Sequence, residues 1–177
     1  MLTGSEIVRE VESGNITIIP FDKQAVNPNS INLTLGKTLF VLEGELDMRL
    51  PCRYREVTIP PEGYRLVPGE AYLGSTVEYI GTDKFGSTYC GRSSTGRLFI
   101  KSQIDAGHVD VGFHGHLTLE IEVTRPCRIY AGVHIGQWIL YALTGDIDML
   151  YSSVGNYTGQ TTPVPSKMWK SFLVDKE

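Results

Sequence analysis

The sequence predicts a mainly β fold, a small and mostly antiparallel β-barrel or jelly-roll with one short helix at its N-terminus. Three observations support this prediction. Apolar and polar residues alternate with a period of two in several segments, most clearly over residues 116–123. Gly and Pro separate nearly all of these segments, which is typical of short strands joined by turns. A helical period occurs at the N-terminus, before the period changes to two.

The N-terminal helix has a start signal, an apolar face and a stop signal. Thr3 and Glu6 have the spacing of a capping box, in which each side chain satisfies a free backbone N–H group. Gly14 favours the end of the helix, because glycine readily adopts the left-handed conformation that terminates many helices. The apolar stripe between these signals consists of Ile7, Val8 and Val11.

Short β-rich segments follow the helix at close intervals. The expected strands span residues 15–19, 30–36, 38–44, 55–60, 64–69, 71–80 and 116–123, and residues 133–143 form either a strand pair or one long strand. Within 116–123, one face is expected to carry Leu117, Leu119, Ile121 and Val123, and the other His116, Thr118, Glu120 and Glu122. From residue 152 the chain becomes polar and rich in Gly and Pro, which predicts an arm or flap over 152–177.

Length and composition predict a single domain, residues 1–177, of the soluble globular class. The 177 residues are 41% hydrophobic and 20% charged, and no apolar run is long enough for a transmembrane helix. The net charge of −4 argues against binding to duplex nucleic acid, which favours a basic surface. The N-terminus lacks the features of a signal peptide, and three widely spaced cysteines fit a reducing compartment. A cytoplasmic location is therefore expected.

The stretch Cys90–Ser102, CGRSSTGRLFIKS, concentrates arginines and hydroxyl groups in front of an expected apolar strand. Arginine binds phosphate oxygens through a rigid fork of donors, and glycine lets backbone amides approach a ligand, so the stretch suits a polyphosphate. Each charge-assisted hydrogen bond would contribute about 1.5–3 kcal/mol. The stretch does not contain a Walker motif. A polar β-turn with solvated arginines explains the same residues equally well, and both interpretations stay open.

A second polar constellation covers residues 105–122, DAGHVDVGFHGHLTLEIE. Asp110 is expected on a turn or bulge, because glycines flank it on both sides. Glu120 lies mid-strand, where a carboxylate in a cleft could shuttle protons near neutral pH. Pattern alone does not separate it from Glu122, and a simply wet strand face explains both. The histidines of this region are interpreted as ordinary polar residues rather than as metal ligands.

Together these segments resemble the dCTP deaminase branch of the trimeric dUTPase superfamily. The family motif GRSSxxRLG is similar to GRSSTGRLF (91–99), and the run AGHVDVGFHGHLTLE (106–120) aligns with its family counterpart without a gap. Further similar segments are NPNSINLTLG (27–36), GVHIGQ (132–137) and NYTGQTTPVPSKMW (156–169). The resemblance spans nearly the whole chain and implies a dUTPase-like distorted β-barrel that assembles as a homotrimer, with active sites between subunits.

The resemblance also implies roles for individual residues. Glu120 matches the glutamate that activates water for attack at C4 of cytosine and passes a proton to the departing ammonia. Ser93 and Arg97 match residues that organise the water and the developing charge, and Asp110 matches the residue that contacts the deoxyribose 3′-hydroxyl. The remaining substrate-binding residues implied are Arg92 and Ser94 at the phosphates, Ala106, Thr118 and Leu119 at the base, Tyr151 and Gln160 on the closing arm, and Gln137.

The implied reaction is a zinc-independent deamination of dCTP. The sequence agrees, since the H-x-E and P-C-x-x-C motifs of zinc deaminases do not occur in it. The resemblance implies Mg²⁺, bound with the nucleotide triphosphate rather than in a protein cage, and dTTP as a candidate inhibitor. It implies no metal-ligating residue in the chain. A phage origin is as compatible with the sequence as a cellular one, and in that case the host cytoplasm is the expected location.

Several residues depart from the family pattern or select within it. Asp105 stands where Thr or Asn is common, and Asn156 stands where many members have a lysine that would add positive charge to the arm. Asn32 and Thr34 replace an Asp and an Arg whose role is mainly packing. Gly107 favours the bifunctional type, which also cleaves dUTP to dUMP and diphosphate. Two alternatives are retained, a dUTP diphosphatase alone and a non-catalytic nucleotide-binding trimer.

Overall fold

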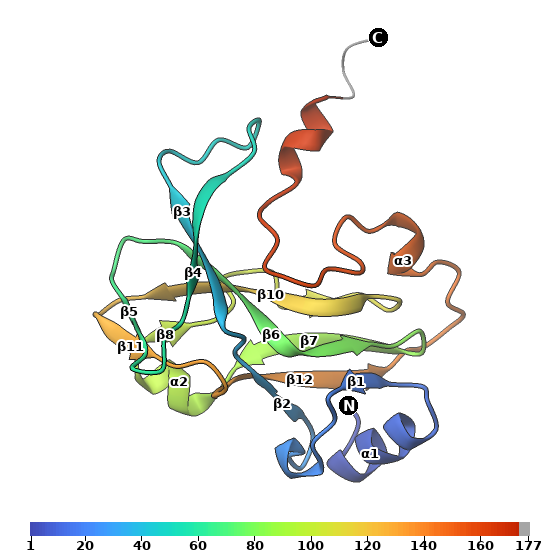
Figure 1. Ribbon diagram of the computed structural model, residues 1–177. Helices are drawn as coiled ribbons and strands as arrows, with labels where there is room; N and C mark the ends of the chain where they lie inside the picture. The colour runs from blue at the N-terminus through green and yellow to red at the C-terminus, as the bar shows by residue number, and fades with distance from the viewer. Residues whose placement is uncertain (174–177) are drawn as a thin grey trace.

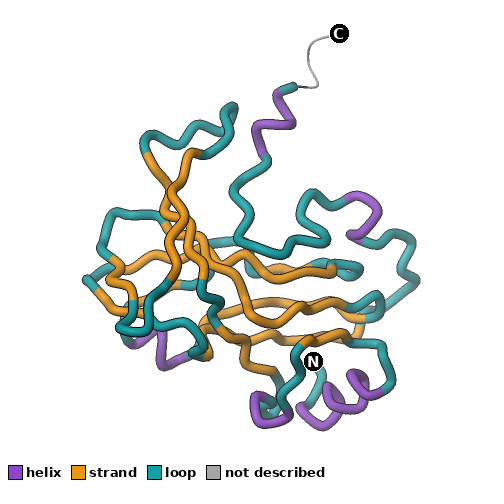
Figure 2. Tube along the Cα trace, viewed as in Figure 1, coloured by secondary structure: helices purple, strands orange, loops and turns teal. Residues whose placement is uncertain are grey.

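Residues 1–173, which the computed structural model describes, form two antiparallel sheets that face each other across an apolar core (Figures 1 and 2). The larger sheet contains β1 (Thr17–Ile19), β3 (Thr38–Glu43), β4 (Arg53–Thr58), β6 (Tyr72–Gly81), β8 (Ile100–Lys101) and β10 (His114–Val123). The second contains β2 (Ile31–Thr34), β7 (Phe85–Gly91), β9 (His108–Val109) and β12 (His134–Ala142), and a separate pair joins β5 (Tyr64–Leu66) to β11 (Cys127–Ile129). The helical elements are α1 (Gly4–Glu12), η1 (Lys23–Ala25), α2 (Ser93–Arg97), α3 (Tyr151–Val154) and η2 (Met168–Phe172).

The predicted mainly β fold with a short N-terminal helix is confirmed. Helix α1 begins where the sequence indicated, because the Thr3 hydroxyl accepts a hydrogen bond from the Glu6 N–H at 3.3 Å. Ile7 anchors the helix in the core, and the chain turns at Gly14, whose φ of 80° is in the left-handed region. Every described helix is too short or too polar to cross a lipid bilayer.

Strand β10 lies inside the larger sheet, paired with β6 along most of its length and with β8 at its end. Its side chains alternate as predicted: the residues at odd positions are buried, and those at even positions are half-buried. The buried face packs into the core with Ile80 of β6 and with Trp138 and Leu140 of β12. A ten-residue strand fixed on one face presents Thr118 and Glu120 together on the opposite face.

Of the two alternatives for residues 133–143, the structure has the one long strand, β12. Two details of the sequence interpretation were wrong. The polar stretch after Gly91 is a short helix, α2, and only two residues of strand, β8, follow it. Strand β7 was missed because Gly, Ser and Thr dilute its hydrophobic pattern, although Phe85, Ser87 and Tyr89 are all buried along it.

The segment after α3 lies against β10, as Figure 1 shows, and hydrogen bonds fix it there. The Gly159 N–H donates to the His114 carbonyl at 2.6 Å, and the His116 N–H donates to the Gln160 carbonyl at 3.0 Å. These bonds run along the part of β10 that β8 leaves free. They place Gln160 beside the polar face of β10. The last four residues of the predicted arm, 174–177, lie outside the described residues.

Core packing behind the polar face of β10 should dominate stability. Leu119 is 0% exposed, and truncating a buried leucine removes apolar contacts and leaves a cavity. Leu119→Ala is expected to lower the free energy of unfolding by about 2–5 kcal/mol, measured by urea denaturation. Ile19→Ala is a matched control, because Ile19 is 63% exposed on β1, and it should cost less than about 0.5 kcal/mol. Equal effects of both changes would contradict the assigned core.

Candidate functional site

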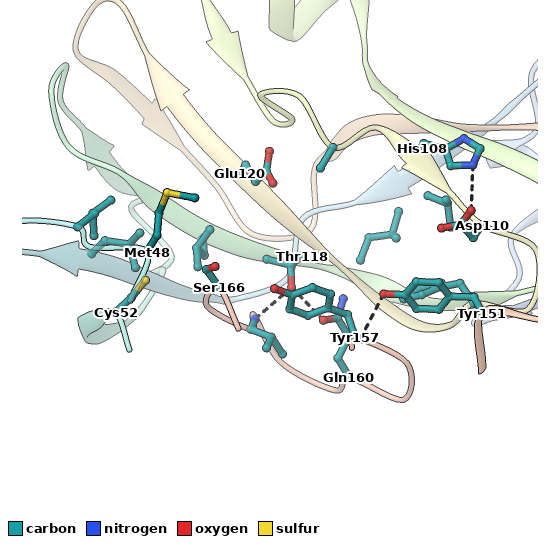
Figure 3. A pocket seen from close by; sticks show the side chains of 18 of the residues that line it. Met48, Cys52, His108, Asp110, Thr118, Glu120, Tyr151, Tyr157, Gln160 and Ser166 are labelled. Atoms are coloured by element: carbon teal, nitrogen blue, oxygen red, sulfur yellow. Dashed lines mark hydrogen bonds and ion pairs between the residues drawn. The ribbon is translucent and has the colours of Figure 1, made fainter. Parts of the chain in front are cut away.

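A cavity of about 550 Å³ opens above the polar face of β10. The β3–β4 hairpin closes one side, the loop around β9 closes another, and the segment after α3 forms the floor (Figure 3). The polar side chains in its lining are Asp47, His108, Asp110, Thr118, Glu120, Tyr151, Tyr157, Gln160 and Ser166, together with Cys52. The apolar lining consists of Leu42, Leu46, Met48, Leu50, Leu73, Ala106, Val109, Phe113, Leu117 and Val164. A mostly apolar hollow with a few convergent polar groups is typical of a small-molecule site.

Glu120 lines the cavity from β10, where it is half-buried. Its Oε2 atom accepts a hydrogen bond from the backbone N–H of Ile104 at 3.0 Å, so the carboxylate is tied to the loop before β9. The described structure gives Oε1 no partner among protein groups. Glu122 points the same way two residues later, but it pairs with Lys101 and does not line the cavity. Tertiary structure therefore separates the two glutamates that the sequence pattern could not.

Asp110 lines the opposite part of the cavity, at the end of β9. Its carbonyl accepts from the Phe113 N–H at 3.1 Å, so the residue opens a tight turn, as predicted. Its Oδ1 atom lies 3.1 Å from Nε2 of His108, and both side chains are largely exposed. Asp110 thus contacts His108 through one carboxylate oxygen and faces the same cavity as Glu120.

Tyr151 of α3, Gln160 of the segment after it and Thr118 of β10 line adjoining parts of the cavity. The Thr118 hydroxyl donates to Oε1 of Gln160 at 3.3 Å, and Nε2 of Gln160 donates to the His116 carbonyl at 2.6 Å. The Tyr151 hydroxyl accepts from the Tyr157 N–H at 3.3 Å. Burial raises the pKa of Tyr151, and the negative charge of Asp110 raises it further, so the phenol keeps its proton at neutral pH.

Four predicted site residues lie away from this cavity, on or next to α2. Figure 1 shows α2 beside β8 and β11, at the other side of the molecule from α3. The guanidinium of Arg92 donates to the His134 carbonyl at 3.2 Å, whereas Ser93, Ser94 and Arg97 on α2 are exposed. The predicted residues placed here are Arg92, Ser93, Ser94 and Arg97. None of the four lines the cavity that Glu120 lines.

Two further predicted residues also lie outside the cavity lining. The Leu119 side chain is in the core, so only its backbone atoms could reach a ligand on the polar face of β10. Gln137 lies on β12, where its Oε1 accepts from the Ser30 hydroxyl at 2.8 Å. In contrast, the cavity gathers six predicted residues, namely Ala106, Asp110, Thr118, Glu120, Tyr151 and Gln160.

Sequence reasoning missed the contribution of the β3–β4 hairpin. Leu46, Met48 and Cys52 line the cavity although they are about seventy residues from Glu120 in the chain, and no local pattern predicts that approach. Tyr157 also lines the cavity, and its hydroxyl accepts from the Lys167 N–H at 2.9 Å. The only sequence signal for Tyr157 is its position in the arm motif.

Comparisons with known proteins agree on one family. The chain is 43% identical over 173 residues to the dCTP deaminase, dUMP-forming, of Clostridium beijerinckii, covering 97% of this chain and 98% of that protein. The protein of the same description from Leptospira biflexa is also 43% identical over 173 residues, with the same coverage of both chains. That from Clostridium acetobutylicum is 41% identical over 174 residues, 98% of this chain and 99% of that protein.

The fold has a solved counterpart. The crystal structure of 2′-deoxycytidine 5′-triphosphate deaminase from Agrobacterium tumefaciens superposes with a TM-score of 0.62 at 22% sequence identity. The match covers 78% of this chain and 46% of that chain, so this protein spans less than half of the solved one. A model of the family described as dCTP deaminase-like matches residues 1–143, which include both sheets, α2 and Glu120. The chain belongs to the dCTP deaminase-like family.

Proposed function

We propose that this protein deaminates dCTP and cleaves the resulting dUTP, releasing ammonia, diphosphate and dUMP. The relatives that match over nearly the full length are described as dUMP-forming dCTP deaminases. The observation that carries the proposal is the Glu120 carboxylate, which faces a cavity of about 550 Å³ with one oxygen held by the Ile104 N–H and the other free. A base that is fixed at one oxygen keeps the other oriented for proton transfer.

In the deamination, Glu120 takes a proton from a water molecule as the water oxygen bonds to C4 of cytosine. The tetrahedral centre then collapses, the bond from C4 to the amino nitrogen breaks, and the proton held by Glu120 leaves with that nitrogen as ammonia. Thr118 and the backbone of Leu119 flank the base on β10, with Ala106 on the adjoining loop. Tyr151 of α3 and Gln160 of the segment after α3 bound the site, and Gln160 is anchored on β10.

The phosphate-binding half of the site comes from a neighbouring subunit in this proposal. Ser93, Ser94 and Arg97 are exposed in the single chain, and apolar residues that follow α2 are exposed as well, with Leu98 59%, Phe99 64% and Ile104 57% exposed. Phe99 holds a φ of 56°, a left-handed conformation that is uncommon for a bulky residue, where the family motif has glycine. Exposed apolar residues next to the exposed Arg97 fit a surface buried by another copy of the chain. The proposed assembly is a homotrimer in which Arg92, Ser93, Ser94 and Arg97 complete the neighbour's site, near Gln137.

The second step is assigned to Asp110. Its carboxylate contacts the deoxyribose 3′-hydroxyl and orients or activates the water that attacks the α-phosphorus of dUTP, so that the bond to the leaving diphosphate breaks. Asp110 and Glu120 line one cavity from different elements, which lets a single bound nucleotide meet both carboxylates. Gly107, which has no side chain, lies directly before β9 and Asp110, as in the bifunctional type that the sequence resembles.

Mg²⁺ is proposed to enter as part of the substrate, bound to triphosphate oxygens. Among residues 1–173, no three His, Cys, Asp or Glu side chains are grouped so that they could hold a metal ion. An ion in this site would therefore keep its waters and its phosphate ligands, as Mg²⁺ does in nucleotide sites. When bound, the ion neutralises phosphate charge. A candidate inhibitor is dTTP, and the proposed location is the cytoplasm, or the host cytoplasm for a phage protein.

Product analysis tests the proposal directly. Purified protein incubated with dCTP and Mg²⁺ is expected to release ammonia and dUMP in equal amounts. An ammonia assay measures the first product and nucleotide chromatography the second. A parallel incubation with dUTP should also give dUMP. Ammonia with accumulating dUTP would reduce the activity to deamination alone. No ammonia from dCTP but dUMP from dUTP would make the protein a dUTP diphosphatase, and binding without turnover would leave a non-catalytic trimer.

A further inference from the structure

The loop between β8 and β9, residues 102–107, forms the wall of the cavity beside Glu120. Both ends of the loop are fixed on Tyr89 of β7. The Tyr89 hydroxyl donates to Oγ of Ser102 at 2.8 Å inside the core, and the Tyr89 N–H donates to the Gly107 carbonyl at 2.7 Å. Between these anchors, Ile104, Asp105 and Ala106 are exposed, and core packing does not hold them.

One side chain organises the middle of this loop. The amide oxygen of Gln103 points into the loop and accepts hydrogen bonds from three successive backbone N–H groups, those of Asp105 at 3.0 Å, Ala106 at 3.1 Å and Gly107 at 3.2 Å. The opposite amide orientation would set a nitrogen donor against three other donors, so the oxygen faces the loop. A single acceptor thus fixes the backbone of three residues that the core leaves free.

Gly107 provides the space for this arrangement. A Cβ atom at Gly107 would lie 2.7 Å from the Tyr89 carbonyl oxygen and 3.2 Å from Cδ of Gln103. Any side chain there would push the loop away from β7 or displace the Gln103 amide. Gly107 and Gln103 therefore depend on each other, because the amide reaches the three N–H groups only while the loop backbone lies this close to β7 and to the Gln103 side chain.

The loop contacts Glu120 through one backbone hydrogen bond. The N–H of Ile104, immediately after Gln103, donates to Oε2 of Glu120, and Ala106 lines the cavity on the same loop. Figure 3 shows Glu120 between the hairpin residues Met48 and Cys52 and the His108–Asp110 pair. We infer that Gln103 is a positioning residue for deamination: it holds the Ile104 N–H that orients Glu120 and the Ala106 wall of the base site. This inference deepens the proposed function and rests on it.

Two substitutions at one position test the inference. Gln103→Met keeps the length of the side chain but removes the acceptor, whereas Gln103→Glu keeps an oxygen that accepts the same three bonds. Displacing a catalytic group by about 1 Å costs about 10²-fold in rate, so Gln103→Met is expected to lower kcat for ammonia release from dCTP by about that factor. Gln103→Glu should recover most of the rate. Cleavage of added dUTP, which depends on Asp110, should change far less in both variants.

Gln24→Met is the matched control, because Gln24 is exposed on η1 and its side chain has no hydrogen bond in the described structure. It should leave both reactions unchanged. The inference is overturned if Gln103→Met keeps ammonia release within about twofold of the unmodified protein, or if Gln103→Glu is as impaired as Gln103→Met. It is also overturned if ammonia release and dUTP cleavage fall together with the melting temperature, since that pattern means general loss of structure.

Amide hydrogen exchange separates this inference from the proposed function. In the ligand-free protein, Gln103→Met should speed exchange at Asp105, Ala106 and Gly107, and at Ile104, whose N–H reports the contact with Glu120. Gln103→Glu should preserve the protection. If the unmodified protein releases no ammonia, the proposed function fails while exchange still tests the role of Gln103. Unchanged exchange at Ile104 in Gln103→Met would refute the positioning role in either case.

Discussion

Glu120→Gln is expected to slow ammonia release from dCTP by at least about 10²-fold and to leave the cleavage of dUTP largely intact. Glutamine preserves the shape of the side chain, and its amide oxygen can still accept from the Ile104 N–H. It cannot take a proton from water or return one to the amino nitrogen. Because general acid–base catalysis contributes about 10²–10⁴-fold, kcat for deamination should fall within that range, measured by a continuous ammonia assay at saturating dCTP.

Glu122→Gln is the control for this substitution. Glu122 lies on the same face of β10 two residues later, but it pairs with Lys101, its side chain is 39% exposed and it does not line the cavity. An exposed ion pair contributes about 0–1 kcal/mol to stability, so this variant should keep both activities. Equal loss in the two variants, or a Glu120→Gln protein that still deaminates, would remove Glu120 from the chemistry. Loss of dUTP cleavage together with deamination would indicate a distorted site.

Two inactive variants are expected to restore activity when they assemble together. Arg97 lies exposed on α2, which contributes no residue to the cavity that Glu120 lines. If each site combines α2 of one subunit with the cavity of another, a trimer of Arg97→Ala and Glu120→Gln chains contains some sites with both residues intact. In each mixed trimer one site in three combines both intact halves, so purified mixed trimers should give about a third of the unmodified rate per site, measured after co-expression and purification through two tags.

The matched control mixes Arg92→Ala with Arg97→Ala. Both changes affect the α2 half, so every site in this mixture carries a defective phosphate-binding segment and no activity should return. Recovery in the control would mean that the subunits do not share sites in the proposed way. Failure of the Arg97→Ala and Glu120→Gln mixture, despite confirmed mixed trimers, would place both residues in sites built from a single chain, contrary to the separation that the structure shows.

Local patterns in the sequence predicted the elements whose structure depends on near neighbours. The cap at Thr3 and the alternation along 116–123 were confirmed, because a helix cap and the pleat of a strand are set by residues a few positions apart. Strand β7 was missed, since Gly and Ser are weak strand formers and its pairing with β12 and β9 joins residues far apart in the chain. Helix α2 was missed because its five residues contain no apolar stripe.

The candidate site likewise contains residues that the sequence predicted and residues that only tertiary contacts identified. The sequence by itself determined the family and the residues that carry its motifs, among them Glu120, Asp110 and Arg97, because motif spacing is a property of the chain. Only the tertiary structure distinguished Glu120 from Glu122, since that difference depends on which side chain the Ile104 N–H and the cavity meet. It also revealed the loop held by Gln103 and the hairpin residues Met48 and Cys52. The hairpin approach and the Ile104–Glu120 bond join segments far apart in sequence, and the bonds of Gln103 depend on the backbone geometry of one loop, so no local pattern of hydrophobic residues encodes them.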